Sequence, residues 1–275
     1  MAEQYDGKVV WITGGGSGLG RAMAFEFASK GFKIAVSGRR ADRLDEVVEA
    51  LAAKGTEGLA IPCDVTDESD IEAALEKIVA DFGHVDVVVA NAGFAVGGSV
   101  ESLSAADWRR QMEVNVVGLT STIRLSLPYL RETGGRLGLI GSVAGMIAAP
   151  GTAAYTASKY AVRAIGQVLS MELYATGVSC TTIHPGFVES EIGQVDNRGK
   201  FHEDRKDQRP GKLMWATEDA ARVMVKAILK RKREYVFTGH GKLGAFLGMH
   251  TPGLVHFVMT RAASRSKALA SLNER

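Results

Sequence analysis

Two side chains near the middle of the sequence, Tyr155 and Lys159, have the types and spacing of an acid–base pair. Residues four apart lie on one face of a helix, and a nearby ammonium favours the phenolate, so we expect Lys159 to lower the pKa of Tyr155. A tyrosine with an ordinary pKa of about 10 is a poor base at neutral pH. The pair therefore predicts a general acid for carbonyl reduction and a general base for alcohol oxidation.

Ser142 is a second candidate, because it directly follows an apolar run at residues 135–141. Its hydroxyl can donate a hydrogen bond to a substrate oxygen and so stabilise the negative charge that develops there. Asn115 is a third polar candidate and lies in a long helical stretch, 105–131. Taken alone, a Tyr–Lys pair at this spacing also occurs by chance on many helices, as a surface or packing pair.

A glycine-rich turn at residues 13–20, Thr-Gly-Gly-Gly-Ser-Gly-Leu-Gly, follows the first apolar run and precedes a helical stretch. This placement points backbone N–H groups and a helix N-terminus at a bound pyrophosphate. The spacing is not the G-x-G-x-x-G fingerprint, and a plain tight turn is the alternative interpretation. The predicted phosphate-binding residues are Gly14, Gly16, Ser17, Gly18, Leu19 and Gly20.

Arg39 and Arg40 follow the second apolar run, where a dinucleotide site selective for NAD carries an Asp or Glu. Guanidinium groups form charge-assisted bonds to phosphate oxygens, so the pair indicates a 2′-phosphate and favours NADP (NADPH). The alternative is a solvated arginine pair ahead of the next helix.

The elements that must position these residues follow from the alternation of short apolar runs and helical stretches. The expected strands are 8–13, 33–37, 59–62, 85–90, 135–141, 178–184 and 235–238, and the expected helices are 21–30, 43–54, 68–82, 105–131, 153–175 and 218–230. This order predicts an α/β fold, a doubly wound, Rossmann-like parallel sheet of about seven strands with helices on both faces. Ligands bind such sheets beyond the carboxyl ends of the strands.

Composition limits the class of protein further. The chain has 275 residues, 46% of them hydrophobic and 23% charged, which is typical of a compact protein, and we expect one domain, 1–275. A net charge of +2 argues against a nucleic-acid partner. We expect a cytoplasmic protein, because the chain has only two cysteines and lacks a secretion signal. We expect no metal, because the histidines do not have the spacing of metal ligands.

With these features together, the chain resembles the short-chain dehydrogenase/reductase family, in its single-domain, NADP-preferring branch, over about residues 8–235. The family's glycine motif matches residues 13–20, and its Asn-Ala-Gly motif matches Asn91, Ala92 and Gly93. Its catalytic tetrad matches Asn115, Ser142, Tyr155 and Lys159.

The resemblance implies further roles for these and neighbouring residues. Asp64 and Val65 would contact the adenine, and Pro185, Gly186 and Val188 would lie against the nicotinamide. Tyr155 and Lys159 would also contact the cofactor, Lys159 through the ribose hydroxyls, and Asn115 would hold a proton-relaying water. Ser190 stands where the family often has Thr, and a Ser hydroxyl can make the same hydrogen bond to the nicotinamide amide. The resemblance also implies a homodimer or homotetramer.

Two segments lie outside the motifs. Residues 189–215 are polar and densely charged, and their place after Pro185 and Gly186 predicts a mobile lid, with a solvated excursion as the alternative. The extension at 240–275 is apolar over 243–260, where Pro252 argues against a transmembrane helix. It would form a lipophilic wall of the substrate pocket, a subunit contact or a segment lying on a membrane surface.

The sequence thus predicts an NADP-dependent oxidoreductase that interconverts a ketone or aldehyde with an alcohol, with Tyr155 as general acid and base and Ser142 binding the substrate. The apolar extension suggests a lipophilic carbonyl substrate. Two alternatives remain open: a dinucleotide-binding regulatory protein without turnover, and a sugar-nucleotide epimerase or dehydratase on a related scaffold.

Overall fold

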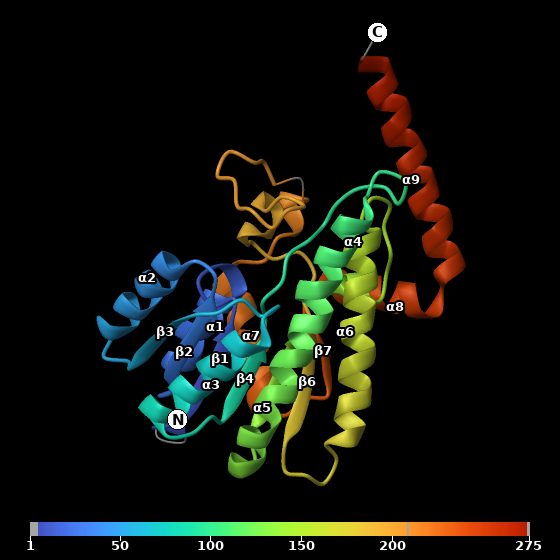
Figure 1. The fold of residues 1–275 in the computed structure, drawn as a ribbon. Coiled ribbons are helices and arrows are strands. Elements are labelled where there is room, and N and C mark those ends of the chain that lie inside the picture. Colours follow the sequence, from blue (N-terminus) through green and yellow to red (C-terminus); the bar gives the residue numbers. More distant parts are fainter. Residues whose placement is uncertain (1–4, 208, 274–275) are drawn as a thin grey trace.

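The computed structural model of the chain describes residues 5–207 and 209–273. A seven-stranded parallel sheet, in the order β3-β2-β1-β4-β5-β6-β7, forms its centre (Figure 1). The strands are β1 Val9–Thr13, β2 Lys33–Gly38, β3 Gly58–Pro62, β4 Val87–Ala90, β5 Arg136–Ile140, β6 Ser179–His184 and β7 Glu234–Val236. The doubly wound sheet predicted from the sequence is therefore confirmed.

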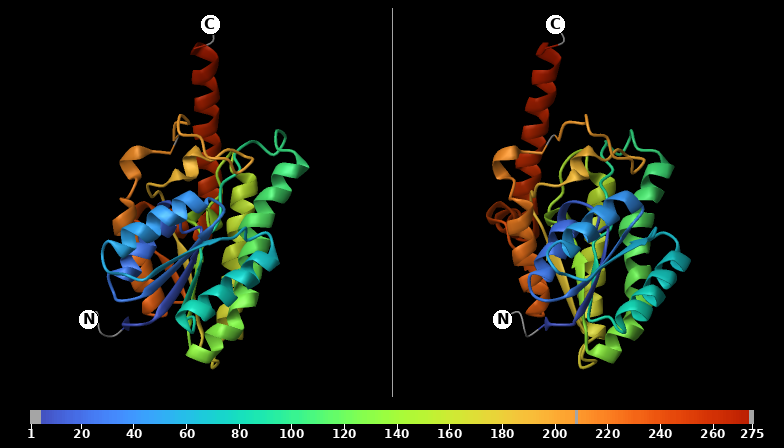
Figure 2. Two further views of the ribbon diagram at one scale, coloured as in Figure 1. Left: turned by 60° about the vertical axis from the view of Figure 1, so that its left-hand side comes forward. Right: turned by 90° about the vertical axis from the view of Figure 1, so that its left-hand side faces the viewer.

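Helices cover both faces of this sheet (Figures 1 and 2). One face carries α1 Gly18–Ala28, α2 Ala41–Ala52 and α7 Thr217–Leu229; the other carries α3 Glu68–Phe82, α5 Leu119–Thr133 and α6 Ala153–Glu172. Each face has its own buried cluster, because strands of a parallel sheet covered on both sides present apolar residues in both directions.

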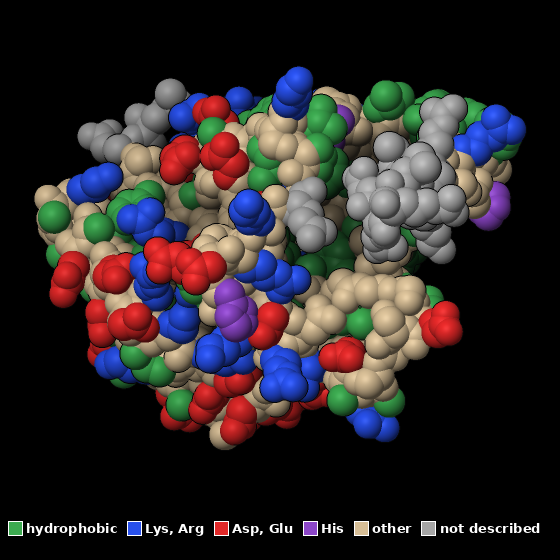
Figure 3. Space-filling model, turned by 90° about the horizontal axis from the view of Figure 1, so that it is seen from above, with side chains coloured by type: hydrophobic (Ala, Val, Ile, Leu, Met, Phe, Trp, Pro, Cys, Tyr) green, Lys and Arg blue, Asp and Glu red, His purple; other side chains and the backbone are tan. Residues whose placement is uncertain are grey.

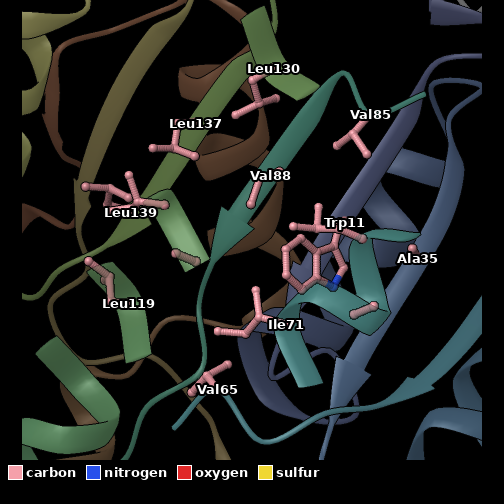
Figure 4. Packing of buried hydrophobic residues seen from close by; sticks show 14 of the residues in the cluster. Trp11, Ala35, Val65, Ile71, Val85, Val88, Leu119, Leu130, Leu137 and Leu139 are labelled. Carbon is pink, nitrogen blue, oxygen red and sulfur yellow. The ribbon is translucent and has the colours of Figure 1, made fainter. Parts of the chain in front are cut away.

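Trp11 of β1 shows how the strands are held in place. Its ring is fully buried among aliphatic side chains from neighbouring strands and from α3, as Figure 4 shows. Its Nε1–H donates to the Ser37 hydroxyl of β2 over 3.0 Å, so the polar edge of the ring is satisfied. Strands β1 and β2 are thus linked by a side-chain hydrogen bond as well as by their ladder.

The chain reverses its winding direction at β1. From β1 it runs outward to β2 and β3, and it then crosses back to β4 on the other side of β1. Crevices form at such a switch point because the loops leaving β1 and β4 turn in opposite directions. The glycine turn and the Asn91 turn begin at these two strand ends.

The long helical stretch predicted at 105–131 is interrupted in the structure. It consists of α4 Ala105–Met112, a π-helical turn η2 Glu113–Gly118, and α5. Asn115 lies in η2, at the point where the long helix departs from α-helical geometry. Such π turns insert an extra residue per turn and change the direction in which side chains point.

The C-terminal part departs from the predicted boundaries. Strand β7 ends at Val236 rather than 238, because the Thr238 hydroxyl caps α8 Gly239–His250 by accepting from the N–H of Gly241 over 3.1 Å. The next helix, α9 Pro252–Asn273, stands away from the body of the molecule (Figures 1 and 2). Among the residues that the structure describes, no helix combines the length and apolarity that a bilayer crossing needs.

Candidate active site

A cleft of about 880 Å³ opens at the carboxyl ends of the strands. All the sequence-predicted cofactor and substrate residues line it, with contributions from the loops after β1 to β6. They are Gly14, Gly16, Ser17, Gly18, Leu19, Gly20, Arg39, Arg40, Asp64, Val65, Asn91, Ala92, Gly93, Ser142, Tyr155, Lys159, Pro185, Gly186 and Val188. Asn115 is the predicted residue that does not line the cleft.

The glycine turn has room for a ligand because side chains are excluded from it. Gly14 has φ +65°, and a Cβ on it would lie 2.9 Å from the Cα of Ala92. A Cβ on Gly20 would overlap the carbonyl oxygen of Gly14. Ser17 precedes α1 without using its hydroxyl as a cap, so the first N–H groups of the helix face the cleft unbonded by that side chain. This cradle fits a dinucleotide pyrophosphate.

Asn91 connects the turns after β1 and β4. Its side-chain amide donates to the carbonyl oxygens of Thr13 and Gly14, over 2.8 and 3.2 Å. In return, the Thr13 hydroxyl accepts from the backbone N–H groups of Asn91 and Ala92, over 3.0 and 3.1 Å. Through these hydrogen bonds, the Asn-Ala-Gly segment holds the glycine turn in its shape.

Arg39 and Arg40 both lie at the cleft, and both also bond to residues 189–215. The Arg39 guanidinium donates to the Gly199 carbonyl over 3.1 Å. Arg40 donates to the Ser17 hydroxyl over 3.0 Å and forms an ion pair of 2.8 Å with Glu191. The arginines thus connect the second strand end, the glycine turn and the segment that covers them.

Tyr155 and Lys159 lie on α6 and Ser142 follows β5, so packing of α6 on the sheet brings the three together. The Lys159 ammonium donates to the carbonyl oxygen of Ile140 over 2.7 Å and lies 5.8 Å from the centre of the Tyr155 ring. The Ser142 hydroxyl accepts from the N–H of Ala144 over 3.1 Å, which leaves its own proton available for another acceptor.

The electrostatics of Tyr155 differ from the sequence-based expectation. Burial raises the pKa of its phenol above the ordinary value, against smaller lowering effects from the Ser142 hydroxyl and the Arg209 guanidinium. Lys159, expected to lower this pKa, is itself buried, and desolvation lowers its own pKa to about 8. In the protein alone, desolvation disfavours both the phenolate and the ammonium, which accounts for this difference. The expectation for the pair beside an oxidised nicotinamide stays a prediction.

Asn115 is held behind the cleft. Its side-chain oxygen accepts from the N–H of Phe94 over 3.1 Å, and its amide donates to the Phe94 carbonyl and the Ser158 hydroxyl over 3.0 and 3.1 Å. Ser158 is the neighbour of Lys159 on α6. These contacts make Asn115 a link between η2, the segment after β4 and the helix that carries Tyr155.

Residues 189–215 cover the cleft, and charged side chains of both signs are interleaved on this side of the molecule (Figure 3). Two short helices, η4 Glu191–Gln194 and η5 Gly211–Leu213, lie within the segment. Asn197 exchanges two hydrogen bonds with the backbone of Gly97, of 3.0 and 2.8 Å, on the far side of the cleft. Arg209 donates to the carbonyl oxygens of Val188 and Ser190, both over 2.9 Å.

Several lining residues were missed in the sequence analysis. They are chiefly Arg43, Phe94, Val114, Glu191, Ile192, Val195, Lys200, Phe201 and Arg209. Arg43 had a local signal, since it lies four residues after Arg39 at the start of α2. The others carry no motif, and their positions depend on how the covering segment packs.

Within residues 239–262 of the C-terminal extension, no side chain lines the cleft. Instead α8 packs against η3 Val143–Gly145, the short helix after Ser142, and a Cβ on Gly248 would overlap the Met146 carbonyl. Six of its large apolar residues are exposed, each with 43–61% of its surface accessible. They are Leu243, Phe246, Met249, Leu254, Phe257 and Val258. Within the described part of the chain, no group of His, Cys, Asp or Glu forms a metal site.

Comparison with known proteins supports the family resemblance found in the sequence. A family model described as short chain dehydrogenase matches residues 8–200. The chain is 36% identical to sulfoacetaldehyde reductase 2 of Chromohalobacter salexigens over 194 residues, which cover 70% of this chain and 77% of that protein.

Two solved structures extend the likeness to most of the fold. A short-chain dehydrogenase/reductase from Burkholderia phymatum in complex with NAD aligns with a TM-score of 0.79 and 29% identity, covering 87% of this chain and 91% of the other. An alcohol dehydrogenase from the archaeon Thermococcus sibiricus, complexed with 5-hydroxy-NADP, aligns with a TM-score of 0.74 and 28% identity, covering 84% and 95%.

Proposed function

The chain belongs to the short-chain dehydrogenase family of oxidoreductases, and we propose that it uses NADP(H) to interconvert a ketone or aldehyde with an alcohol. One observation carries this proposal. Ser142, Tyr155 and Lys159 line the same cleft as the glycine turn and Arg40. A proton donor, an oxygen-binding hydroxyl and a dinucleotide cradle are the parts that carbonyl reduction requires.

The cofactor, when bound, supplies the hydride, and the side chains of this protein manage the proton and the substrate oxygen. Ser142 donates a hydrogen bond to the carbonyl oxygen and stabilises its developing charge. Tyr155 donates the proton to that oxygen in reduction and accepts it in oxidation. Because burial raises the pKa of Tyr155, its phenol is protonated at neutral pH, which is the form that reduction needs.

Lys159 and Asn115 support these two groups. With a pKa of about 8, Lys159 is mostly protonated at pH 7 and offers its ammonium to the ribose hydroxyls. Asn115 contacts α6 through its bond to Ser158. As the family resemblance implies, it would also hold a water that passes protons from Lys159 to solvent. Residues of the cleft would then enclose both ends of the dinucleotide: the adenine would lie against Asp64 and Val65, and the nicotinamide against Pro185, Gly186 and Val188.

The preference for NADP rests on the chain's own residues, because the structures similar to it hold both NAD and an NADP derivative. Arg39 and Arg40 directly follow the end of β2, and no Asp or Glu stands at that strand end. Both guanidinium groups line the cleft, where they can bind a 2′-phosphate.

We propose a carbonyl substrate with an apolar substituent, since Phe94, Val114, Ile192 and Val195 line the cleft. Oxidation of NADPH, followed with carbonyls graded in size and polarity, tests the proposal. We expect the largest kcat/KM for bulky apolar ketones or aldehydes. A preference for small polar carbonyls would contradict the substrate class, and NADPH binding without turnover of any carbonyl would favour a regulatory protein.

A homodimer or homotetramer is the proposed assembly, formed largely through the long helices around residues 105–131 and 153–175. Large apolar side chains on this side are exposed, with Met171 67% and Tyr174 85% accessible. Exposed apolar groups of this size favour contact with another surface. Light scattering coupled to gel filtration should give a mass of two or four chains. The free, buried thiols of Cys63 and Cys180 are compatible with the proposed cytoplasmic location.

A further inference from the structure

Glu191 lies where the proposed cofactor's 2′-phosphate would meet the protein. Its carboxylate forms the 2.8 Å ion pair with Arg40, and the same guanidinium nitrogen donates to Ser17 of the glycine turn over 3.0 Å. All three residues line the cleft. Arg40 and Glu191 are 151 positions apart in the chain, so this contact arises from the packing of the covering segment on the sheet.

Glu191 faces a group of positive charges at the beginning of α2. Besides its ion pair with Arg40, it contributes, after Glu46, to raising the pKa of Arg43. In the described part of the covering segment, Glu191 is the acidic side chain that pairs with Arg40. Phe201 lies with its ring centre 5.5 Å from that guanidinium, and the Gly199 carbonyl accepts from Arg39. Asp42 also lines the cleft, but Glu191 is the acid that forms an ion pair with Arg40, so its carboxylate is the one that a phosphate bound to Arg40 must displace.

We propose that Glu191 is a specificity-determining residue that competes with the 2′-phosphate of NADP(H) for Arg40 and thereby narrows the preference for NADP over NAD. This inference rests on the proposed use of NADP(H) at the same site. An acidic side chain and a phosphate cannot share one guanidinium without repulsion, so one of them must leave it. NAD(H) has a neutral 2′-hydroxyl, so its binding does not require the ion pair between Arg40 and Glu191 to break.

The competition also connects the cofactor to the covering segment. Glu191 opens η4 at the start of that segment, and Gly199 and Phe201 contact Arg39 and Arg40 from its middle. Displacing Glu191 from Arg40 removes one of the contacts that hold the segment over the cleft. The cost is modest, because Arg40 and Glu191 are 40% and 29% exposed and such pairs are weak.

The experiment measures binding by calorimetry with two probes that differ only in the 2′-phosphate, 2′,5′-ADP and 5′-AMP. The test variant is Glu191→Gln, which keeps the shape of the side chain and removes its charge. The matched control is Glu189→Gln, because Glu189 is exposed, lies two residues away and does not line the cleft. Thermal unfolding of each variant verifies that it folds.

We expect Glu191→Gln to bind 2′,5′-ADP about three- to tenfold more tightly than the wild type does. Its affinity for 5′-AMP should stay within about twofold, and Glu189→Gln should match the wild type with both probes. The gain for 2′,5′-ADP should shrink at about 0.5 M salt, because ions screen half-exposed charges. An unchanged affinity for 2′,5′-ADP, or an equal gain for both probes, would overturn the role of Glu191.

Arg40→Ala separates this inference from the proposed cofactor. If NADP(H) is the cofactor, this variant loses affinity for 2′,5′-ADP and keeps that for 5′-AMP. In that case a negative result with Glu191→Gln contradicts the competition alone. If Arg40→Ala leaves both affinities unchanged and the wild type does not distinguish the probes, the proposed NADP preference fails, and the inference fails with it.

Discussion

The Lys159 ammonium is buried and lies 5.8 Å from the centre of the ring of Tyr155, which is half-buried at the cleft. The pKa values of this pair differ from the simple expectation that a lysine lowers the pKa of a neighbouring phenol. Desolvation moves the two pKa values apart and reverses their order: the pKa of the phenol rises above its ordinary 10.0, and that of the ammonium falls from 10.5 to about 8. The resting pair therefore consists of a protonated phenol and a lysine that titrates near pH 8.

Tyr155→Phe should abolish the proton donor and leave the cleft otherwise intact. We expect kcat for carbonyl reduction to fall by about 10²–10⁴-fold, the usual contribution of a general acid. NADPH binding, measured by fluorescence, should stay within about threefold. Turnover equal to that of the wild type would show that another group supplies the proton.

Lys159→Met should change how stability depends on pH. Below pH 8 the lysine is protonated in both states, so burying its charge destabilises the fold. As the pH rises from about 8 to 10.5, the folded protein releases the proton while the unfolded chain keeps it, and this destabilisation disappears. Relative to the wild type, the variant's unfolding free energy should thus fall by on the order of 3 kcal/mol across this window.

Urea unfolding of both proteins at several pH values between 7 and 10.5 checks this prediction. The comparison must be between the two proteins, because Cys63 and Cys180 act in the opposite sense. Burial raises their pKa values from 9.0 to about 12, so they lower stability as the pH rises through that range. A difference between the proteins that does not vary with pH would contradict a depressed Lys159 pKa.

Gly20→Ala should prevent cofactor binding. The added methyl group would overlap the Gly14 carbonyl oxygen and lie 2.6 Å from the Asn91 amide nitrogen, so the turn between β1 and α1 must shift. We expect a loss of NADPH affinity of more than about tenfold and a destabilisation of about 1–3 kcal/mol. Fluorescence titration and thermal unfolding measure the two effects. Gly253→Ala is the control, because its methyl group meets no atom within 4 Å.

Asn197→Ala should loosen the covering segment, which we propose to be a lid. The change removes both hydrogen bonds to the Gly97 backbone, which contribute about 1–2 kcal/mol together. Trypsin should then cleave within residues 189–215 several-fold faster, as timed by mass spectrometry. Gln167→Ala, at an exposed position of α6, should leave the cleavage rate unchanged. Equal rates in all three proteins would argue that Asn197 does not hold the segment down.

Local sequence signals were enough to locate most of the cleft. The turn at residues 13–20 and the arginines after β2 follow directly from strands whose apolar runs are short and continuous. In a doubly wound sheet the carboxyl ends of all strands meet at one edge, so a residue's place after a strand predicts its place in the cleft. The glycine turn, the cleft positions of Ser142, Tyr155 and Lys159, and the fold itself could be inferred from the sequence.

The tertiary structure decided what depends on contacts between distant parts of the chain. No local sequence pattern predicts the ion pair between Arg40 and Glu191, because a loop with many charges of both signs offers several acids that could pair with a given arginine. The pKa direction of Tyr155 likewise depends on how much water the surrounding segments exclude, a property of packing and not of spacing. Residue types and intervals determine which groups can react; burial determines the charge that each of them carries.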